Sequence, residues 1–238
     1  RSIPFVSRTV VRETLTSSGG SEVRSLVRSV VIFTLLFEMA GTAAFYFMFR
    51  RDQTAAVAFK NALFHSVSAF CNAGFSLFPD SFVRWRFDSG MNTILFSLIV
   101  CGGLGFITLA DLWKWFSSRA VAFIETARGG AGFLIERRAL SVHSRMVLTV
   151  TAFAIVAGAL IFWLLPVRGP GGGARSLHFL EALFLSITAR TAGFNTISTA
   201  SLGDASIVFL LMLMFMGASP GSTGGGVKTT TVGILLGT

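Results

Sequence analysis

Long apolar stretches, separated by short polar segments, run through the whole chain. Four of them carry little or no charge and are about 20 residues long, the length that a helix needs to cross a bilayer. They cover residues 29–49, 89–110, 146–167 and 205–227, and the last is apolar only as far as Met216 and rich in glycine beyond it. We therefore expect four spanning helices.

Two further apolar stretches, residues 61–79 and 181–195, are too short or too polar to cross a bilayer. Each lies between two of the expected spans, begins as a helix-like segment and ends at the tripeptide Ala-Gly-Phe. Stretches of this kind are candidates for re-entrant segments. The pattern predicts an all-α membrane protein with two re-entrant pore loops.

The chain also contains an internal repeat. FKNALFHSVSA at 59–69 aligns with FLEALFLSITA at 179–189, and after a one-residue gap NAGF at 72–75 aligns with TAGF at 191–194. Both copies follow the order of spanning helix, short helix, Ala-Gly-Phe and spanning helix. Parallel repeats of this type usually surround a shared axis. We expect two helix–pore helix–helix repeats. The first covers residues 29–110, and the second, which is truncated, covers residues 146–238.

Composition and charge agree with a membrane protein. Hydrophobic residues make up 53% of the chain and charged residues only 13%, whereas about a quarter of a soluble domain is charged. Basic residues gather in residues 1–28 and 111–145, which marks these two segments, and with them the N-terminus, as cytoplasmic. The glycine-rich stretch 127–133 divides the second segment and leaves room for a short interfacial helix on either side. No basic patch is interleaved with aromatic residues, which argues against nucleic-acid binding.

Residue types that carry catalysis or bind metals are scattered along the chain. Cys71 and Cys101 give neither a disulfide framework nor a metal-binding spacing, and no HExxH or GxSxG motif is present. We expect neither an enzyme nor a bound cofactor. The chain begins without methionine and ends at Thr238 inside an apolar stretch, so we expect a fragment of a longer protein.

The stretch MGASPGSTGGGVKTTT at 216–231 looks like a phosphate-binding loop. Such a loop reads GxxxxGK[ST] between a strand and a helix. Gly221 and Gly226 have the glycine spacing, but the next residue is Val227, and Lys228 comes one place late. The apolar stretch before it is also too long for an ordinary strand. We therefore expect no nucleotide site here.

The two Ala-Gly-Phe segments suit a cation. A short helix that stops inside a membrane leaves its last carbonyl groups unpaired, so they must line a wet cavity or be buried in protein. Carbonyl oxygens and helix C-terminal ends around an axis replace the hydration shell of a cation. Gly74 and Gly193 suit such a segment because glycine accepts backbone angles that a side chain resists. We expect Phe75 and Phe194 to pack outward and hold it. The alternative, a simple helix C-cap, stays open.

Three motifs in order carry a family resemblance. FHSVSAFCNAGFSLFP (64–79), SITARTAGFNTIS (186–198) and GASPGSTGGGVKTTT (217–231) resemble the Trk/Ktr/HKT superfamily of potassium transporters, above all the membrane subunit of bacterial Ktr- or Trk-type systems. The resemblance implies four repeats around one pore, of which this chain shows two. It also implies a filter in which K⁺ binds to the backbone carbonyls of Asn72, Ala73, Gly74, Phe75, Thr191, Ala192, Gly193 and Phe194.

The resemblance assigns a gate to the glycine-rich stretch. The fourth helix would break beneath the filter and form an intramembrane loop from Gly217, Ala218, Ser219, Pro220, Gly221, Ser222, Thr223, Gly224, Gly225 and Gly226. Lys228 would place a positive charge near the ion path and raise a barrier to cations. The alternative, a flexible link between two helices, stays open.

The implied function is potassium uptake across the bacterial inner membrane by a multi-pass protein. The implied partners are a cytosolic nucleotide-binding regulatory subunit, a second copy of the membrane subunit and the surrounding lipid, with K⁺ or Na⁺ as the transported ion. Two alternatives stay open. The first is a sodium-permeable or Na⁺- or H⁺-coupled transporter of the same fold, and the second is a non-conducting membrane scaffold.

Several polar or small residues in the membrane region have two interpretations. Arg190 either repels ions from the pore or points behind its segment and pairs with an acid or carbonyl groups. Glu38, inside the first span, either serves the pore or has a structural partner such as Arg190 or Ser and Thr groups. We expect a satisfied hydrogen bond at His65 and a role for Glu181 at a helix N-terminus. Glycines within 102–105 permit close helix packing or a hinge.

Overall fold

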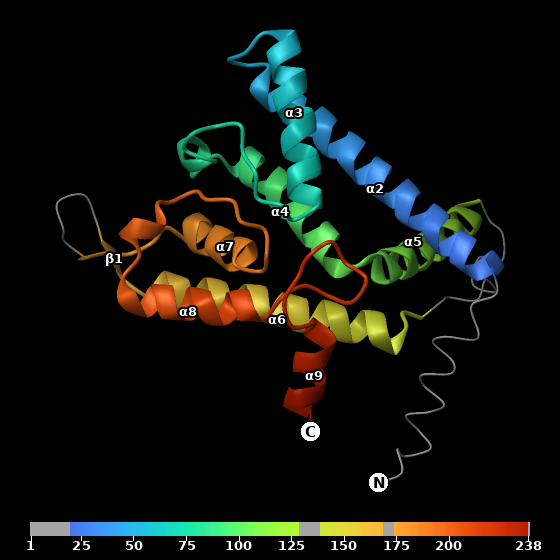
Figure 1. Ribbon diagram of the computed structural model, residues 1–238. Helices are drawn as coiled ribbons and strands as arrows, with labels where there is room; N and C mark the ends of the chain where they lie inside the picture. Colours follow the sequence, from blue (N-terminus) through green and yellow to red (C-terminus); the bar gives the residue numbers. More distant parts are fainter. Residues whose placement is uncertain (1–19, 129–138, 169–173, 238) are drawn as a thin grey trace.

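Helices make up most of the described chain, which comprises residues 20–128, 139–168 and 174–237 of this computed structural model (Figure 1). In chain order they are α2 (Gly20–Phe49), α3 (Ala55–Phe70), η1 (Val83–Trp85), α4 (Ser89–Leu104), α5 (Phe106–Ala127), α6 (Val142–Leu164), α7 (Phe179–Thr188), η3 (Thr199–Ser201), α8 (Asp204–Phe215) and α9 (Thr229–Gly237).

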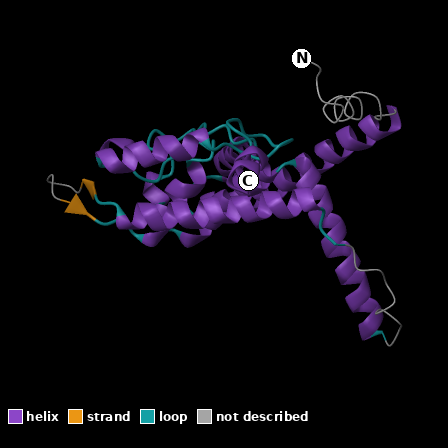
Figure 2. Cartoon of the chain, turned by 90° about the horizontal axis from the view of Figure 1, so that it is seen from below, coloured by secondary structure: helices purple, strands orange, loops and turns teal. Residues whose placement is uncertain are grey.

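The predicted helical fold class is confirmed, with one small β element. Strands β1 (Val167–Arg168) and β2 (Ala174–Arg175) form an antiparallel pair at one end of the molecule, drawn in orange in Figure 2. Most of the predicted N-terminal segment 1–28 and most of the glycine-rich stretch 127–133 lie outside the described residues.

Within the described residues, two helices are long and apolar enough to cross a bilayer, over Val27–Phe49 of α2 and Val142–Leu164 of α6. The second predicted span, residues 89–110, is broken instead. α4 ends at Leu104, and α5 leaves it at an angle of 107°. The break lies at Gly105, whose φ of 85° is a conformation that an L side chain resists. The pair counts as a third span only if it is taken as one bent element.

The fourth predicted span, residues 205–227, is broken as well. α8 stops at Phe215, an irregular segment follows, and α9 begins at Thr229. The glycines between them explain the end of the helix, because each costs about 1 kcal/mol relative to alanine in a helix interior. Two of the four predicted spans are therefore discontinuous, while the order of elements is the predicted one.

The internal repeat extends from the short helices into the spanning helices around them. The hydroxyl of Ser66 on α3 donates to a backbone carbonyl of α2 at 2.7 Å and lies directly against Gly41. In the second repeat, the hydroxyl of Ser186 on α7 donates to a backbone carbonyl of α6 at 2.8 Å and lies directly against Gly158. A side chain at either glycine would displace the serine, so both short helices dock on their spanning helix through the same contact.

The largest buried cluster joins the two repeats. Phe82, in the connection between α3 and α4, packs edge-on against Phe194, with the ring centroids 5.4 Å apart. Phe96 on α4 contacts Phe184 on α7 at a centroid distance of 5.7 Å. The connection and α4 of the first repeat therefore cover one side of the second repeat's short helix.

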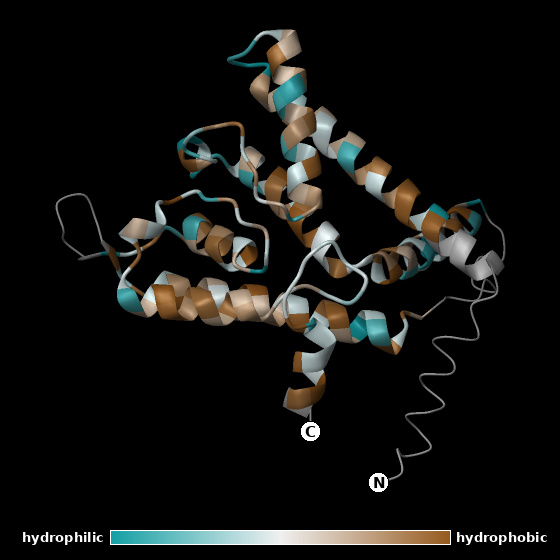
Figure 3. Cartoon of the chain, in the orientation of Figure 1, coloured by the Kyte–Doolittle hydropathy of each residue, from teal (hydrophilic) through white to brown (hydrophobic). Residues whose placement is uncertain are grey.

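Large apolar side chains also remain exposed on the outside of the bundle. Figure 3 shows apolar residues along most of α2, α6 and α8, including their outer faces. In a soluble protein such a surface marks a binding site or an aggregation risk. Here it fits helices that face lipid.

Candidate functional site

The two Ala-Gly-Phe segments adopt the same unusual backbone conformation. They are named loop A (residues 72–75), which follows α3, and loop B (residues 191–194), which follows α7. In loop A, φ is 51° at Asn72 and 72° at Gly74; in loop B, it is 75° at Thr191 and 81° at Gly193. A positive φ is uncommon outside glycine and costly for a β-branched residue such as threonine. A positive φ at the same two positions of both repeats indicates a shared structural requirement.

Loops A and B meet through their glycines. A side chain on Gly74 would place its Cβ 2.6 Å from the carbonyl oxygen of Ala192 and 2.8 Å from the Cα of Gly193. A Cβ on Gly193 would lie 3.2 Å from the Cα of Gly74. The two backbones therefore face each other with no side chain between them.

Each loop is tied back to its short helix by a hydroxyl group. Ser68 on α3 donates to the carbonyl oxygen of Phe75 at 2.8 Å, and Thr188 on α7 donates to that of Phe194 at 2.7 Å. Ser68 and Thr188 occupy the same position of the repeat. Sequence reasoning missed both, although a hydroxyl-bearing residue at one position of both copies was a signal that could have found them.

Replacing Thr188 with valine is expected to destabilise loop B, because the buried carbonyl of Phe194 loses its donor at a cost of about 1–3 kcal/mol. Thr188→Ser keeps the donor and should behave like the original protein. Thermal unfolding of the purified protein measures the difference, with Thr149→Val as the matched control, since the hydroxyl of Thr149 is exposed on α6. Equal unfolding temperatures for Thr188→Val and Thr188→Ser would contradict the assignment.

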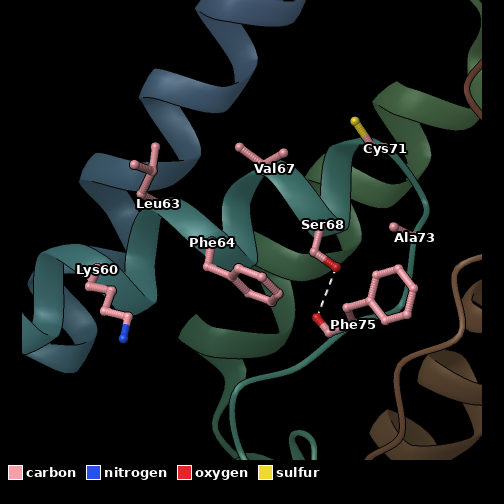
Figure 4. A pocket seen from close by; sticks show the side chains of 8 residues that line it. All are labelled: Lys60, Leu63, Phe64, Val67, Ser68, Cys71, Ala73 and Phe75. Atoms are coloured by element: carbon pink, nitrogen blue, oxygen red, sulfur yellow. Dashed lines mark hydrogen bonds between the residues drawn. The ribbon is translucent and has the colours of Figure 1, made fainter.

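The expectation that both phenylalanines pack outward and hold their loops is correct for one of them. Phe194 is fully buried, whereas Phe75 is 70% exposed. Phe75 lines a groove of about 430 Å³ on the outer side of α3, together with Phe64 and Val67 (Figure 4). The reason for the difference is that the first repeat covers the second, while no described element covers the first.

Comparison with the second repeat shows that the groove on α3 lacks a covering element among the described residues. Phe64 and Val67 are 37% and 36% exposed, but their counterparts Phe184 and Ile187 are only 1% and 5% exposed. The counterparts are buried in the cluster that joins the repeats. The groove on α3 therefore has the shape and chemistry of an uncovered repeat interface.

Residues 217–228 are named the glycine-rich loop. Backbone hydrogen bonds join the two ends of this loop. The amide of Gly217 donates to the carbonyl of Val227 at 3.0 Å, and the amide of Val227 donates to that of Phe215 at 3.1 Å. Gly217 packs so closely on Gly225 that no side chain fits. Because a helix precedes this loop instead of a strand, the structure agrees with the rejection of a phosphate-binding loop.

The tip of the glycine-rich loop fills the break between α4 and α5. A broken helix leaves its last carbonyls without partners. Here the amide of Ser219 donates to the carbonyl of Gly103 at 3.0 Å, and the amide of Thr223 donates to that of Gly102 at 3.2 Å. In return, the amide of Phe106 donates to the carbonyl of Gly221 at 3.0 Å. The loop and the break thus satisfy each other's backbone groups.

Thr223 connects this loop to loop A. Its hydroxyl lies 3.0 Å from the carbonyl oxygen of Phe70 and 3.1 Å from that of Gly102, and it accepts a hydrogen bond from the amide of Asn72 at 3.0 Å. Nothing in the local sequence indicates this contact, since 151 residues separate Asn72 from Thr223. The glycine-rich loop is therefore fastened to the end of α3 and to loop A.

The same loop lies against loop B. A Cβ on Gly224 would be 2.5 Å from the hydroxyl of Thr191, so only glycine allows this approach. Lys228 donates from Nζ to the carbonyl of Gly224 at 3.1 Å. The positive charge of Lys228 is thus held by its own loop, close to the point where that loop touches loop B.

Arg190 and Glu38, two charged groups of the membrane region, do not pair with each other in the structure. Arg190 is buried behind loop B, where Nη2 donates to the hydroxyl of Thr151 at 3.4 Å. The carboxylate of Glu38 is 3.8 Å from the sulfur of Cys71. The suggested Arg190–Glu38 pair is therefore wrong, because each residue lies behind the loop of a different repeat.

Local roles are confirmed for His65 and Glu181. His65 is 2.7 Å from the carbonyl of Asn61 and 3.1 Å from the hydroxyl of Ser76. Glu181 accepts from the amide of His178 at 2.9 Å in a capping box. Close packing, one of the two roles left open for the glycines of 102–105, is found at Gly102, which lies against the end of α3, whereas Gly105 forms the bend between α4 and α5.

Oxygen atoms are the ligands that this site offers to a cation. No group of three His, Cys, Asp or Glu side chains in the described residues has a metal-binding arrangement. The side-chain oxygens Asn72 Oδ1 and Thr191 Oγ1 are buried and have no hydrogen-bond partner among the described residues. They occupy the same position of loops A and B, where α3 and α7 end with the negative ends of their helix dipoles. This arrangement suits an alkali cation.

The known proteins that this chain resembles are cation transport proteins. The family model TrkH, described as "Cation transport protein", matches residues 2–237. The Ktr system potassium uptake protein B of Vibrio alginolyticus is 32% identical over 228 residues, which is 94% of this chain and 46% of that protein. The potassium/sodium uptake protein NtpJ of Enterococcus hirae is 30% identical over 99% of this chain and 49% of its own length.

A solved structure shares the fold. The potassium transporter TrkH of Vibrio parahaemolyticus superposes with a TM-score of 0.58 at 22% identity, covering 95% of this chain and 43% of that one. The chain thus spans about half the length of the curated relatives that it matches.

Proposed function

Because the chain belongs to the TrkH family of cation transport proteins, we propose that it forms part of a pore for potassium uptake and that loops A and B line its selectivity filter. The chain is a multi-pass membrane protein of a transporter family, which is not a class of enzymes. The observation that carries the proposal is the meeting of Gly74 and Gly193, backbone to backbone, in two loops with the same positive φ values.

The chemistry of the proposed filter follows from the loop geometry. Carbonyl dipoles replace the hydration shell of K⁺ only if they stay in place when the ion leaves. Ser68 and Thr188 hold the last carbonyl of each loop, and the ends of α3 and α7 add partial negative charge. At the other end of the loops, Asn72 Oδ1 and Thr191 Oγ1 offer two further oxygens.

A complete ring needs more than the two repeats seen here. We infer that further repeats of a longer protein close it, since the chain spans about half the length of its relatives. The groove beside Phe64 and Phe75 supports this inference, because the corresponding residues of the second repeat are covered by the first. The covering element would correspond to α4 and the connection that carries Phe82.

The glycine-rich loop is the proposed gate. It contacts loops A and B through Thr223 and Gly224 and occupies the break between α4 and α5. In this position it closes the path on the side of the filter where both short helices end. Lys228 would add an electrostatic barrier to cations that approach the closed loop.

The proposed setting is the bacterial inner membrane, with the N-terminus in the cytoplasm. The Vibrio alginolyticus relative is named as part of a Ktr system, and we propose a cytosolic nucleotide-binding regulatory subunit and a second copy of the membrane subunit as partners. K⁺, or in the alternative Na⁺, is the transported ion, and no other cofactor is proposed.

A sodium-permeable transporter is the second candidate. The observation that favours it is the name of the Enterococcus hirae relative, a potassium/sodium uptake protein. Coupling to Na⁺ or H⁺ belongs to the same candidate. A non-conducting scaffold would show no ion flux at all.

Flux measurements on the full-length protein in lipid vesicles test the proposal. We expect K⁺ to enter down its gradient and Na⁺ to enter much more slowly. Equal rates for K⁺ and Na⁺ would favour the second candidate, while flux that requires an opposing Na⁺ or H⁺ gradient would indicate coupling. Vesicles that contain folded protein but take up neither ion would contradict both candidates.

A further inference from the structure

Helix α5 runs across the direction of the helix that precedes it. It leaves the end of α4 at 107° (Figure 1). Membrane-crossing helices are tilted by about 20° on average from the bilayer normal. If α4 enters the bilayer as a spanning segment, α5 therefore lies close to the membrane plane.

One side of α5 is a continuous apolar stripe. Trp113, Phe116, Phe123 and Ile124 recur at the spacing of one helix face, and they are between 49% and 75% exposed. Lys114 and Glu125 lie on the opposite side of the helix, at 100° of rotation per residue, together with the half-exposed Val121. A helix with an exposed apolar face, tryptophan and a charged reverse side is typical of a membrane interface.

A cationic site lies at the edge of this stripe. Arg119 is placed with its guanidinium 4.3 Å from the ring centroid of Trp115. Arg119, Ala122, Phe123 and Thr126 are the described residues that line a cavity of about 280 Å³. The cavity thus combines a positive charge, a hydroxyl group and an aromatic wall at the boundary between the apolar and the polar face.

The geometry points to a phospholipid site: α5 lies in the interface of the cytoplasmic leaflet, and the cavity at Arg119 holds the phosphate headgroup of an anionic phospholipid. The charge of Arg119 suits the phosphate, and the acyl chains can follow the stripe past Phe123. The hydroxyl of Thr126 borders the cavity but donates to the carbonyl of Ala122 at 2.8 Å. The surrounding segment 111–145 is rich in arginine and lysine, as expected near an anionic membrane surface. The inference requires a bilayer-embedded chain, but not the selectivity proposed for loops A and B.

Spin labels on α5 test its environment in the full-length protein reconstituted in vesicles. Labels at Phe116 and Phe123 are compared with labels at Lys114 and Glu125 in a background without Cys71 and Cys101. We expect the stripe to be accessible to oxygen and shielded from a water-soluble nickel complex, and the reverse side to show the opposite. Accessibility of both sides to nickel would place α5 in water, and shielding of the stripe from both reagents would place it against protein. Either result would overturn the inference.

Lipid binding tests the cavity itself. In vesicles that contain spin-labelled phosphatidylglycerol, Arg119→Gln is expected to weaken binding roughly fivefold, the usual contribution of one basic residue at an anionic surface. Lys114→Gln, on the reverse side, is the matched control and should change binding less. Equal losses in both variants, or displacement of the lipid by inorganic phosphate, would contradict a specific headgroup site. Potassium flux is measured in the same vesicles. A failure of the lipid site can then be told apart from a failure of the proposed filter.

Discussion

Deletion of residues 221–226 is expected to raise potassium flux by tenfold or more. The deletion removes the backbone hydrogen bonds of Gly221 and Thr223 to the break between α4 and α5, together with the contact of Thr223 with Asn72. If each hydrogen bond contributes about 1 kcal/mol to the closed position, their loss shifts the gate strongly toward the open one. Initial rates of K⁺ uptake in vesicles that contain equal amounts of protein measure the effect.

Point variants of Thr223 give a graded control for this deletion. Thr223→Val removes the hydroxyl that meets Phe70, Gly102 and Asn72 but keeps the chain length. We expect a smaller rise in flux for Thr223→Val and no rise for Thr223→Ser. Unchanged flux after the deletion would support the simple alternative, in which the glycine-rich loop is only a link between α8 and α9.

Substitution of serine for Gly193 is expected to lower the preference for K⁺ over Na⁺ by about tenfold, because a side chain in the left-handed region costs about 1–2 kcal/mol. The new Cβ would also press on the Cα of Gly74 at 3.2 Å. Gly74→Ser should be more severe, since its Cβ would lie 2.6 Å from the carbonyl oxygen of Ala192. The ratio of K⁺ to Na⁺ permeability in reconstituted vesicles measures both variants.

A matched substitution away from the loops controls for general damage. Ala200→Ser adds the same hydroxyl at an exposed position of η3 and should leave the permeability ratio unchanged. If Gly193→Ser and Gly74→Ser also leave it unchanged while the protein folds, loops A and B do not determine selectivity.

The repeat could be predicted from the sequence because its signal is local. The aligned segments keep residue types and order, so the two short helices, the two glycines and the helical fold class were all visible in one chain. The end of α8 was visible for the same reason, since Gly217 follows Met216 directly and Pro220 and further glycines come soon after. These features depend on backbone preferences of neighbouring residues.

The bend at Gly105 and the docking of the glycine-rich loop could not be predicted in this way. The apolar stretch continues through residues 89–110, so its pattern indicates one helix, and glycines there fit close packing equally well. The structure shows that the loop supplies the missing hydrogen-bond partners of the broken helix. This exchange joins segments more than a hundred residues apart, and neither segment reveals it alone.

The same tripeptide, Ala-Gly-Phe, has different surroundings in loop A and in loop B. Phe75 and Phe194 end the same tripeptide, yet one is 70% exposed and the other is fully buried. Burial depends on the neighbouring repeat, which covers loop B with Phe82 and leaves the groove at loop A open among the described residues. A sequence motif specifies the backbone of such a loop more strongly than it specifies the packing around it.

Anomalous diffraction from thallium tests the central claim most directly. Tl⁺ resembles K⁺ in size and charge, and crystals of the full-length protein soaked with it would locate the cation without relying on flux. We predict anomalous density against the backbone carbonyl oxygens of loops A and B, beside the contact of Gly74 with Gly193, which weakens when K⁺ competes and persists when Na⁺ is added. Density that lies away from both loops, or that Na⁺ removes as readily as K⁺, would contradict a potassium-selective filter at this site.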